Sequence, residues 1–112
     1  MAELQVHGDT VTIALSIAEK IEALHPDVTI PRSAITGARE VPDGLEEVHG
    51  LRMPGTGFPG VILVGTFREP DRTTFAVCHG QRPAIVLDVA GQPYDRIVVT
   101  VDAPDAALAA LG

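Results

Sequence analysis

The sequence has few of the residues on which many binding and catalytic sites are built. It contains one cysteine, Cys78, among 112 residues, so an internal disulfide is excluded. Three phenylalanines, one tyrosine and no tryptophan leave no row of stacking platforms for single-stranded nucleic acid. Eight basic residues stand against fifteen acidic ones, and the net charge of −7 repels phosphate backbones and anionic lipid surfaces. We therefore expect neither nucleic acid nor an anionic membrane as a partner.

Long hydrophobic runs are absent as well. No apolar stretch approaches the roughly 20 residues that a membrane-spanning helix needs. No basic segment followed by an apolar one begins the chain, so the expected location is the cytoplasm. The hydrophobic content of 46% is sufficient for one packed core, and we expect residues 1–112 to form a single domain.

Apolar and polar residues alternate along much of the chain, which is typical of strands with one buried face. Gly8-Asp9 predicts a hairpin between the first two strands, and Gly37 is placed to bend or bulge the third. Short turns after Gly60 predict an antiparallel meander of four strands. The expected strands number about seven and lie at residues 3–7, 10–15, 28–41, 61–67, 73–78, 83–89 and 94–101.

Helical spacing occurs in two places. Ser16 and Glu19 form a capping box ahead of an apolar stripe that ends at His25-Pro26, which predicts a short helix after the first hairpin. A second helix is expected from Pro104 onward, with Ala107, Leu108 and Leu111 on its apolar face. About eight residues are too few to stay helical alone in water, so this helix must dock on the sheets.

The most unusual segment is 52–60, with three glycines and two prolines directly before an apolar strand. It matches the G-x-G-x-x-G pattern of dinucleotide-binding loops, but that mechanism requires a helix after the loop. Here a strand follows, and a proline removes a backbone donor, so no cofactor is expected. We instead assign backbone geometry to the loop residues Pro54, Gly55, Gly57, Pro59 and Gly60.

No catalytic or metal-binding constellation is recognisable. The four histidines have neither the i, i+4 spacing nor the cysteine pairs of metal sites. Cys78 and His79 are neighbours, but adjacent strand residues point to opposite faces, so they cannot readily share a proton. We interpret Cys78 as a packed side chain, and we favour a non-enzymatic protein without metal or cofactor.

Four segments together resemble a family of small bacterial proteins, of actinobacterial type, with a pleckstrin-homology-like fold and no established activity. The resemblance covers nearly the whole chain and is most specific in the Gly/Pro stretch. It implies a mainly β, strongly bent barrel of about seven antiparallel strands that the C-terminal helix caps. The segments are residues 16–35, 50–61, 65–67 and 94–104.

The phosphoinositide-binding members of the wider fold carry basic residues in the loop after the first strand. Between Leu15 and Val28 this chain has one lysine, Lys20, against three acidic residues, which argues against a lipid headgroup as ligand.

We hypothesise a binding or interaction module that presents the 50–60 loop and an exposed sheet edge. Its candidate contact residues are Arg52, Phe58 and His49, and its partner is another protein or a second copy of the chain. The alternative is a small-molecule-binding protein or unrecognised enzyme with a pocket at the barrel mouth near Arg52 and Phe58.

Overall fold

The structure, a computed structural model, describes residues 2–15, 28–44, 51–52, 62–79 and 82–111, without the side chains of 51, 52 and 62–64. These ranges are mainly β, as predicted, and the helix expected over 16–25 lies outside them. The elements are β1 (Glu3–His7), β2 (Thr10–Ala14), β3 (Val28–Pro31), the 3₁₀ turn η1 (Arg32–Ala34), β4 (Ile35–Val41), β5 (Leu51–Arg52), β6 (Ile62–Arg68), β7 (Thr73–His79), β8 (Ala84–Val89), β9 (Arg96–Thr100) and α2 (Pro104–Leu111).

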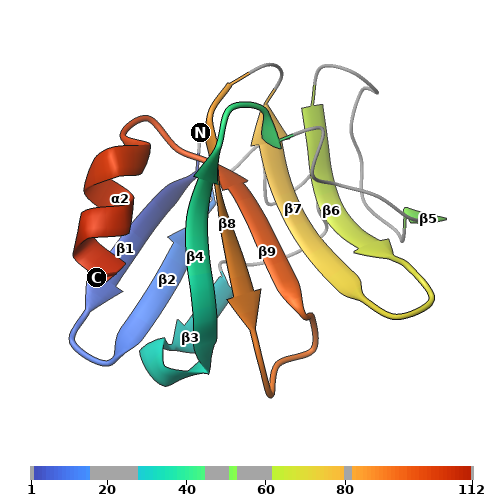
Figure 1. Ribbon diagram of the computed structural model, residues 1–112, viewed down its shortest axis with the longest axis horizontal. Helices are drawn as coiled ribbons and strands as arrows, with labels where there is room; N and C mark the ends of the chain where they lie inside the picture. Colours follow the sequence, from blue (N-terminus) through green and yellow to red (C-terminus); the bar gives the residue numbers. More distant parts are fainter. Residues whose placement is uncertain (1, 16–27, 45–50, 53–61, 80–81, 112) are drawn as a thin grey trace.

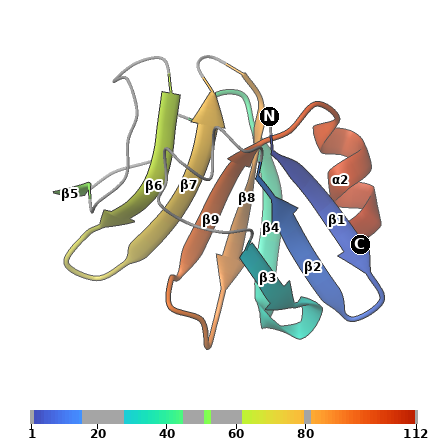
Figure 2. The ribbon, with the colours of Figure 1, turned by 180° about the vertical axis from the view of Figure 1, so that it is seen from behind.

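The strands form two sheets, which Figures 1 and 2 show from opposite sides. One sheet has the order β1-β2-β3, and the other has the order β4-β8-β9-β7-β6-β5. The chain passes from the first sheet to the second through η1, where the Arg32 backbone N–H donates to the Asp9 carbonyl at 2.6 Å. No strand pairing joins the two sheets within the described residues. The described strands therefore form two sheets that are not closed into one, and the bent barrel of about seven antiparallel strands stays a prediction.

The main hydrophobic core lies between the two sheets. Val11 and Ile13 from β2 and Phe75 from β7 are fully buried there, because alternation points them toward the opposite sheet. The buried side chains of the alternating strands 10–15, 73–78, 83–89 and 94–101 that belong to this core are Val11, Ile13, Leu15, Phe75, Val77, Ile85, Leu87, Val89, Ile97, Val99 and Val101.

The meander predicted after Gly60 is wrong in its strand order. β9 does not lie outside β8 but between β8 and β7, and it runs parallel to β7, with Phe75 opposite Ile97 and Val77 opposite Val99. Three consecutive residues of β9, from Ile97 to Val99, are fully buried, as expected of a central strand that is covered on both faces. Turn length predicted the β8–β9 hairpin correctly but carried no information about its other neighbour.

A second apolar cluster lies on the outer face of the six-stranded sheet. Gly44 packs directly against it, since a Cβ atom at this position would lie 2.8 Å from Ala84 Cβ and 3.1 Å from Cys78 Sγ. The cluster explains why β7, β8 and β9 are buried on both faces. Its members are Val41, Phe67, Ala76, Cys78, Ala84, Val86 and Val98.

The C-terminal helix α2 is confirmed, and it lies beside β1 and β4 (Figure 1). Each of these two strands is at one edge of its sheet, so α2 covers the seam between the sheets on this side. Ala107 is its residue in the main core, whereas Leu108 and Leu111 are only partly buried. The helix thus docks through Ala107, with Leu108 and Leu111 packed against the core only in part.

We predict that Gly44→Ala destabilises the protein by about 1–3 kcal/mol, because the added methyl group overlaps packed side chains of the outer cluster. The measurement is chemical denaturation followed by circular dichroism. Gly37→Ala is the matched control, since its Cβ would meet only Asp88 Oδ2 at an ordinary 3.5 Å. Equal denaturation midpoints for the two variants would show that Gly44 is not tightly packed.

Candidate functional site

Most of the sequence-predicted contact residues lie outside the described part of the chain. His49, Phe58 and the loop residues Pro54, Gly55, Gly57, Pro59 and Gly60 belong to this group. The backbone of Arg52 is described: it belongs to β5 and pairs with Phe67 of β6. The 50–60 loop therefore stays a prediction.

Cys78 is a packed side chain, as expected. Its residue is fully buried, and its thiol lies 3.7 Å from the Val98 carbonyl oxygen, to which it donates a weak hydrogen bond. Burial raises the pKa of the thiol to about 12, with a further contribution from the charge of Asp43. A thiol in this state is not a nucleophile at neutral pH.

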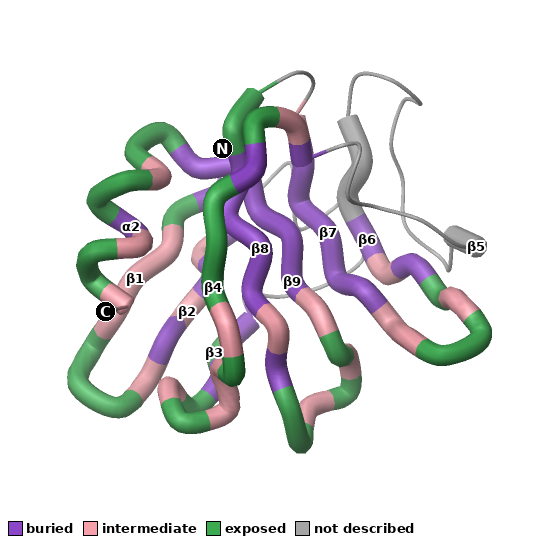
Figure 3. Tube along the Cα trace, in the orientation of Figure 1, coloured by how far each residue is buried: buried purple, intermediate pink, exposed green. Residues whose placement is uncertain are grey.

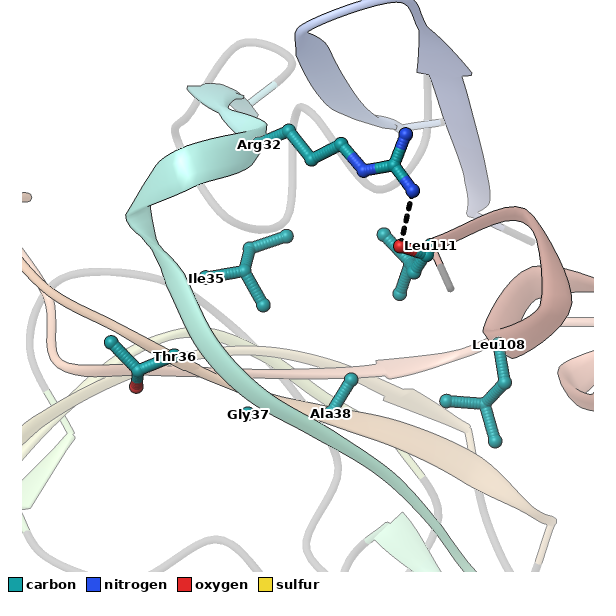
Figure 4. Close-up of a pocket in the computed structure, with 7 residues that line it drawn as sticks. All are labelled: Arg32, Ile35, Thr36, Gly37, Ala38, Leu108 and Leu111. Carbon is teal, nitrogen blue, oxygen red and sulfur yellow. Dashed lines mark hydrogen bonds between the residues drawn. The ribbon is translucent and has the colours of Figure 1, made fainter.

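The most distinct surface feature is a groove between β4 and α2, which Figure 4 shows in close-up. It has a volume of about 640 Å³, within the usual range of ligand sites. Ile35 and Ala38 lie on the strand side, and Leu108 and Leu111 on the helix side. We call it the β4–α2 groove; its lining residues are Arg32, Ile35, Thr36, Gly37, Ala38, Leu108 and Leu111.

Arg32 links the two walls at one end of the groove. Its guanidinium group donates a hydrogen bond to the carbonyl oxygen of Leu111, in the last turn of α2 (Figure 4). A cation at this position also interacts favourably with the negative end of the helix dipole. Because the Arg32 backbone is bonded to the β1–β2 turn, this end of the groove is held from both sides.

Two carboxyl groups approach each other nearer the start of α2. Glu40 follows Ala38 on the same face of β4, and Asp105 precedes Leu108 on the same face of the helix. The side chains of Glu40 and Asp105 share a hydrogen bond, which raises the pKa of Glu40; partial desolvation and the charge of Asp105 raise it further. When both carboxyl groups are ionised, this contact is a repulsive one between like charges.

β4 is the longest of the strands that end a sheet within the described residues. Its neighbour β8 is almost entirely buried, whereas β4 is exposed at Thr36 and over residues 38–40 (Figure 3). Exposure of consecutive residues means that both faces of β4 are open there. The register shift between Ile35 and Gly37 leaves Thr36 as an extra residue, which is the bulge predicted at Gly37, and its hydroxyl donates to the Asp88 carbonyl at 3.2 Å.

The groove was missed at the level of sequence because its residues carry no motif. Leu108 and Leu111 were assigned to the face that docks on the sheets, and helical spacing cannot distinguish a docking leucine from one that lines a groove. Glu40 and Asp105 are far apart in the chain and meet only after folding. The available signal was the run of Ala38, Arg39 and Glu40, which breaks the alternation of a half-buried strand.

No family model matches the chain, and no similar protein was found among curated proteins or solved structures. The resemblance to pleckstrin-homology-like proteins therefore rests on the sequence segments that suggested it. Among the described residues, no helix is long and apolar enough to cross a membrane. No group of three or more His, Cys, Asp or Glu side chains in the same ranges could hold a metal ion.

We predict that Glu40→Gln raises the melting temperature at neutral pH but not in acid. The pKa of Glu40 is raised in the folded state above its ordinary 4.5, so the folded chain binds this proton more tightly than the unfolded chain does. Stability is then lost as the pH rises through the raised pKa, and a glutamine amide, which donates to Asp105 at every pH, avoids that loss. The effect is small because the pair is exposed.

The measurement is the melting temperature of both proteins from below pH 4.5 to neutral. In an Asp105→Ala background the pH-dependent gain should disappear, because Glu40 has lost its partner. A gain that is independent of pH, or that persists in this background, would contradict the assignment.

Proposed function

We propose that this protein is an interaction module that binds a short extended peptide segment in the β4–α2 groove. The observation that carries the proposal is the exposed outer edge of β4 beside a cavity that two leucines line. An edge strand directs unpaired backbone N–H and C=O groups outward, and an incoming strand can pair with them. The side chains of the groove then select which segment binds.

The shape of the groove favours an extended segment. At about 3.3 Å per residue, pairing along β4 from Ile35 to Glu40 would engage roughly six residues of the partner. Alternate side chains of such a segment would point toward Leu108 and Leu111, which supports a preference for apolar residues at every second position. The hydrogen bond of Arg32 to Leu111 holds the helix wall of the groove in place before a segment binds. Binding then does not have to order the helix, so less conformational entropy is lost.

The bulge at Thr36 favours another protein over a second copy of the chain. A bulge twists an edge strand and interrupts its regular pairing, which is how natural sheets discourage continuous edge-to-edge association. A short, flexible segment can follow the twisted edge, whereas a rigid copy of β4 must match the same irregularity. Self-association, the other partner expected from the sequence, is thus the less favoured occupant.

Charge complementarity specifies the partner further. Glu40 and Asp105 repel each other when both are ionised, and a lysine or arginine between them would replace that repulsion with two attractive contacts. We therefore expect one basic residue in the bound segment, on the side that faces the start of α2.

The bacterial pleckstrin-homology-like scaffold is part of this proposal. What supports it is the C-terminal helix at the seam of two packed sheets, together with the sequence segments that resemble the family. In this account the 50–60 loop, with Arg52, Phe58 and His49, is a separate candidate surface.

The proposal predicts that panning of a random heptapeptide library enriches peptides on the wild-type protein but not on Ala38→Trp. Ala38 is exposed, so an indole there fills the groove without disturbing the core. Ala109→Trp is the matched control, because Ala109 is also exposed but does not line the groove. Fluorescence polarisation with the enriched peptide should show at least about tenfold weaker binding to Ala38→Trp.

The enriched peptides should have alternating apolar residues and one lysine or arginine. Replacing that basic residue with alanine should weaken binding to the wild type but not to the Glu40→Gln, Asp105→Asn double variant. Failure to enrich any peptide on the wild type, or equal binding to Ala38→Trp, would overturn the proposed function. If replacing the basic residue weakens binding to the wild type and to the double variant equally, only the charge assignment is overturned.

A further inference from the structure

A second cavity lies on the other side of the molecule from α2. It has a volume of about 510 Å³ and lies between β3 of one sheet and the β6–β7 hairpin and β8–β9 turn of the other. Figure 2 shows these elements away from the seam that α2 covers. The described residues that line it are Val28, Thr29, Thr66, Arg68, Thr73, Gln92, Pro93 and Tyr94.

The only charged side chain among these lining residues is a cation. Arg68 is exposed, and its guanidinium group makes no hydrogen bond or ion pair within the described part of the chain. Other arginines are engaged: Arg72 with Glu69 at 2.9 Å and Arg96 with Asp88 at 3.0 Å. Arg68 lies beside the cavity without such a partner among the described residues.

The carboxylate of Asp95, the residue after Tyr94, already has a hydrogen-bond partner. Asp95 accepts a hydrogen bond from the Thr73 backbone N–H at 2.9 Å, and its own N–H donates to the Thr73 carbonyl at 2.8 Å. These bonds hold Asp95 against the backbone of β7. The guanidinium group of Arg68 is therefore available to an anion from outside.

Tyr94 supplies both a flat surface and a donor. Its half-buried ring packs against Phe75 with a centroid separation of 5.8 Å, which fixes its orientation at the cavity. Burial raises the pKa of its phenol, so the hydroxyl is neutral and can donate a hydrogen bond at physiological pH. The Thr66 hydroxyl and the Gln92 amide add further polar groups to the wall.

We propose that this cavity binds a small organic anion whose carboxylate or phosphate group pairs with Arg68 and whose planar body lies against Tyr94. A guanidinium group offers paired donors that match the oxygens of either oxyanion. The volume suits a single-ring molecule, and the arrangement of few polar groups around an aromatic surface is typical of small-ligand sites. This site is separate from the β4–α2 groove and does not depend on the peptide-binding function.

The test is an NMR titration of the ¹⁵N-labelled protein with benzoate, phenyl phosphate, acetate and inorganic phosphate. The expected result is saturable shifts in the amides of 28–29, 66–68 and 92–94. The two ring-bearing anions should bind more tightly than acetate and inorganic phosphate, because only they contact Tyr94. Whether benzoate or phenyl phosphate binds more tightly distinguishes a carboxylate from a phosphate ligand.

Arg68→Gln should weaken binding about tenfold or more, since a hydrogen-bonded charge is removed. The affinity of Arg68→Lys should lie between those of the wild type and Arg68→Gln, because lysine keeps the charge and loses the paired donors. Tyr94→Phe keeps the ring and should weaken binding only a fewfold. Arg82→Gln is the matched control: Arg82 is exposed and outside the cavity, so its replacement should change nothing.

The absence of saturable shifts up to about 20 mM anion would overturn the proposal. Equal losses in Arg68→Gln and Arg82→Gln would do the same, because they would indicate non-specific attraction to positive charge. Melting curves of each variant establish that it is folded, and Tyr94→Phe, which deletes a single hydroxyl, keeps the test decisive if Arg68→Gln is unstable.

Discussion

The docking of α2 across the seam between β1 and β4 is the interaction on which the β4–α2 groove depends. The helix spans Pro104–Leu111 and is too short to be stable alone in water, so it exists because it packs on the sheets. Ala107 enters the core and Arg32 holds the last turn through the Leu111 carbonyl. Leu108 and Leu111 pack against the core only partly, and their remaining surface lines the β4–α2 groove.

This docking also makes the two seams of the molecule different from each other. On one side the helix and the edge of β4 border a groove that contains Arg32 and two leucines, with an acidic pair toward the start of the helix. On the other side, β3 and the β6–β7 hairpin border a cavity that contains Arg68. Each of the two sites has one arginine among its lining residues, and the acidic pair lies only at the helix-start end of the β4–α2 groove, so the two proposed ligands differ in the charge they would meet there. Neither site requires a change in the central strands, which are buried on both faces.

The features that could be predicted from the sequence are those that depend on local patterns of residues. Alternation identified the first hairpin and the inward side chains, and Gly37 marked the bulge in β4. The position of β9 between β8 and β7 could not be predicted, because alternation and turn length do not specify which strand pairs on the far edge. The uninterrupted apolar run Ile97-Val-Val99 was the available sign of a central strand. The carboxyl pair of Glu40 and Asp105 depends on how the helix packs, and no local pattern contains that information.

The measurement that tests the central claim most directly is amide hydrogen exchange of the protein with and without the peptide that panning enriches. Pairing of the peptide with β4 must satisfy outward-facing backbone amides of this edge strand, so the account predicts slower exchange within residues 35–41 and in the last turn of α2. The amides of β8 and β9, which already pair inside the sheet, should change little. Bound peptide with unchanged exchange in β4, or protection confined to another edge, would contradict the account.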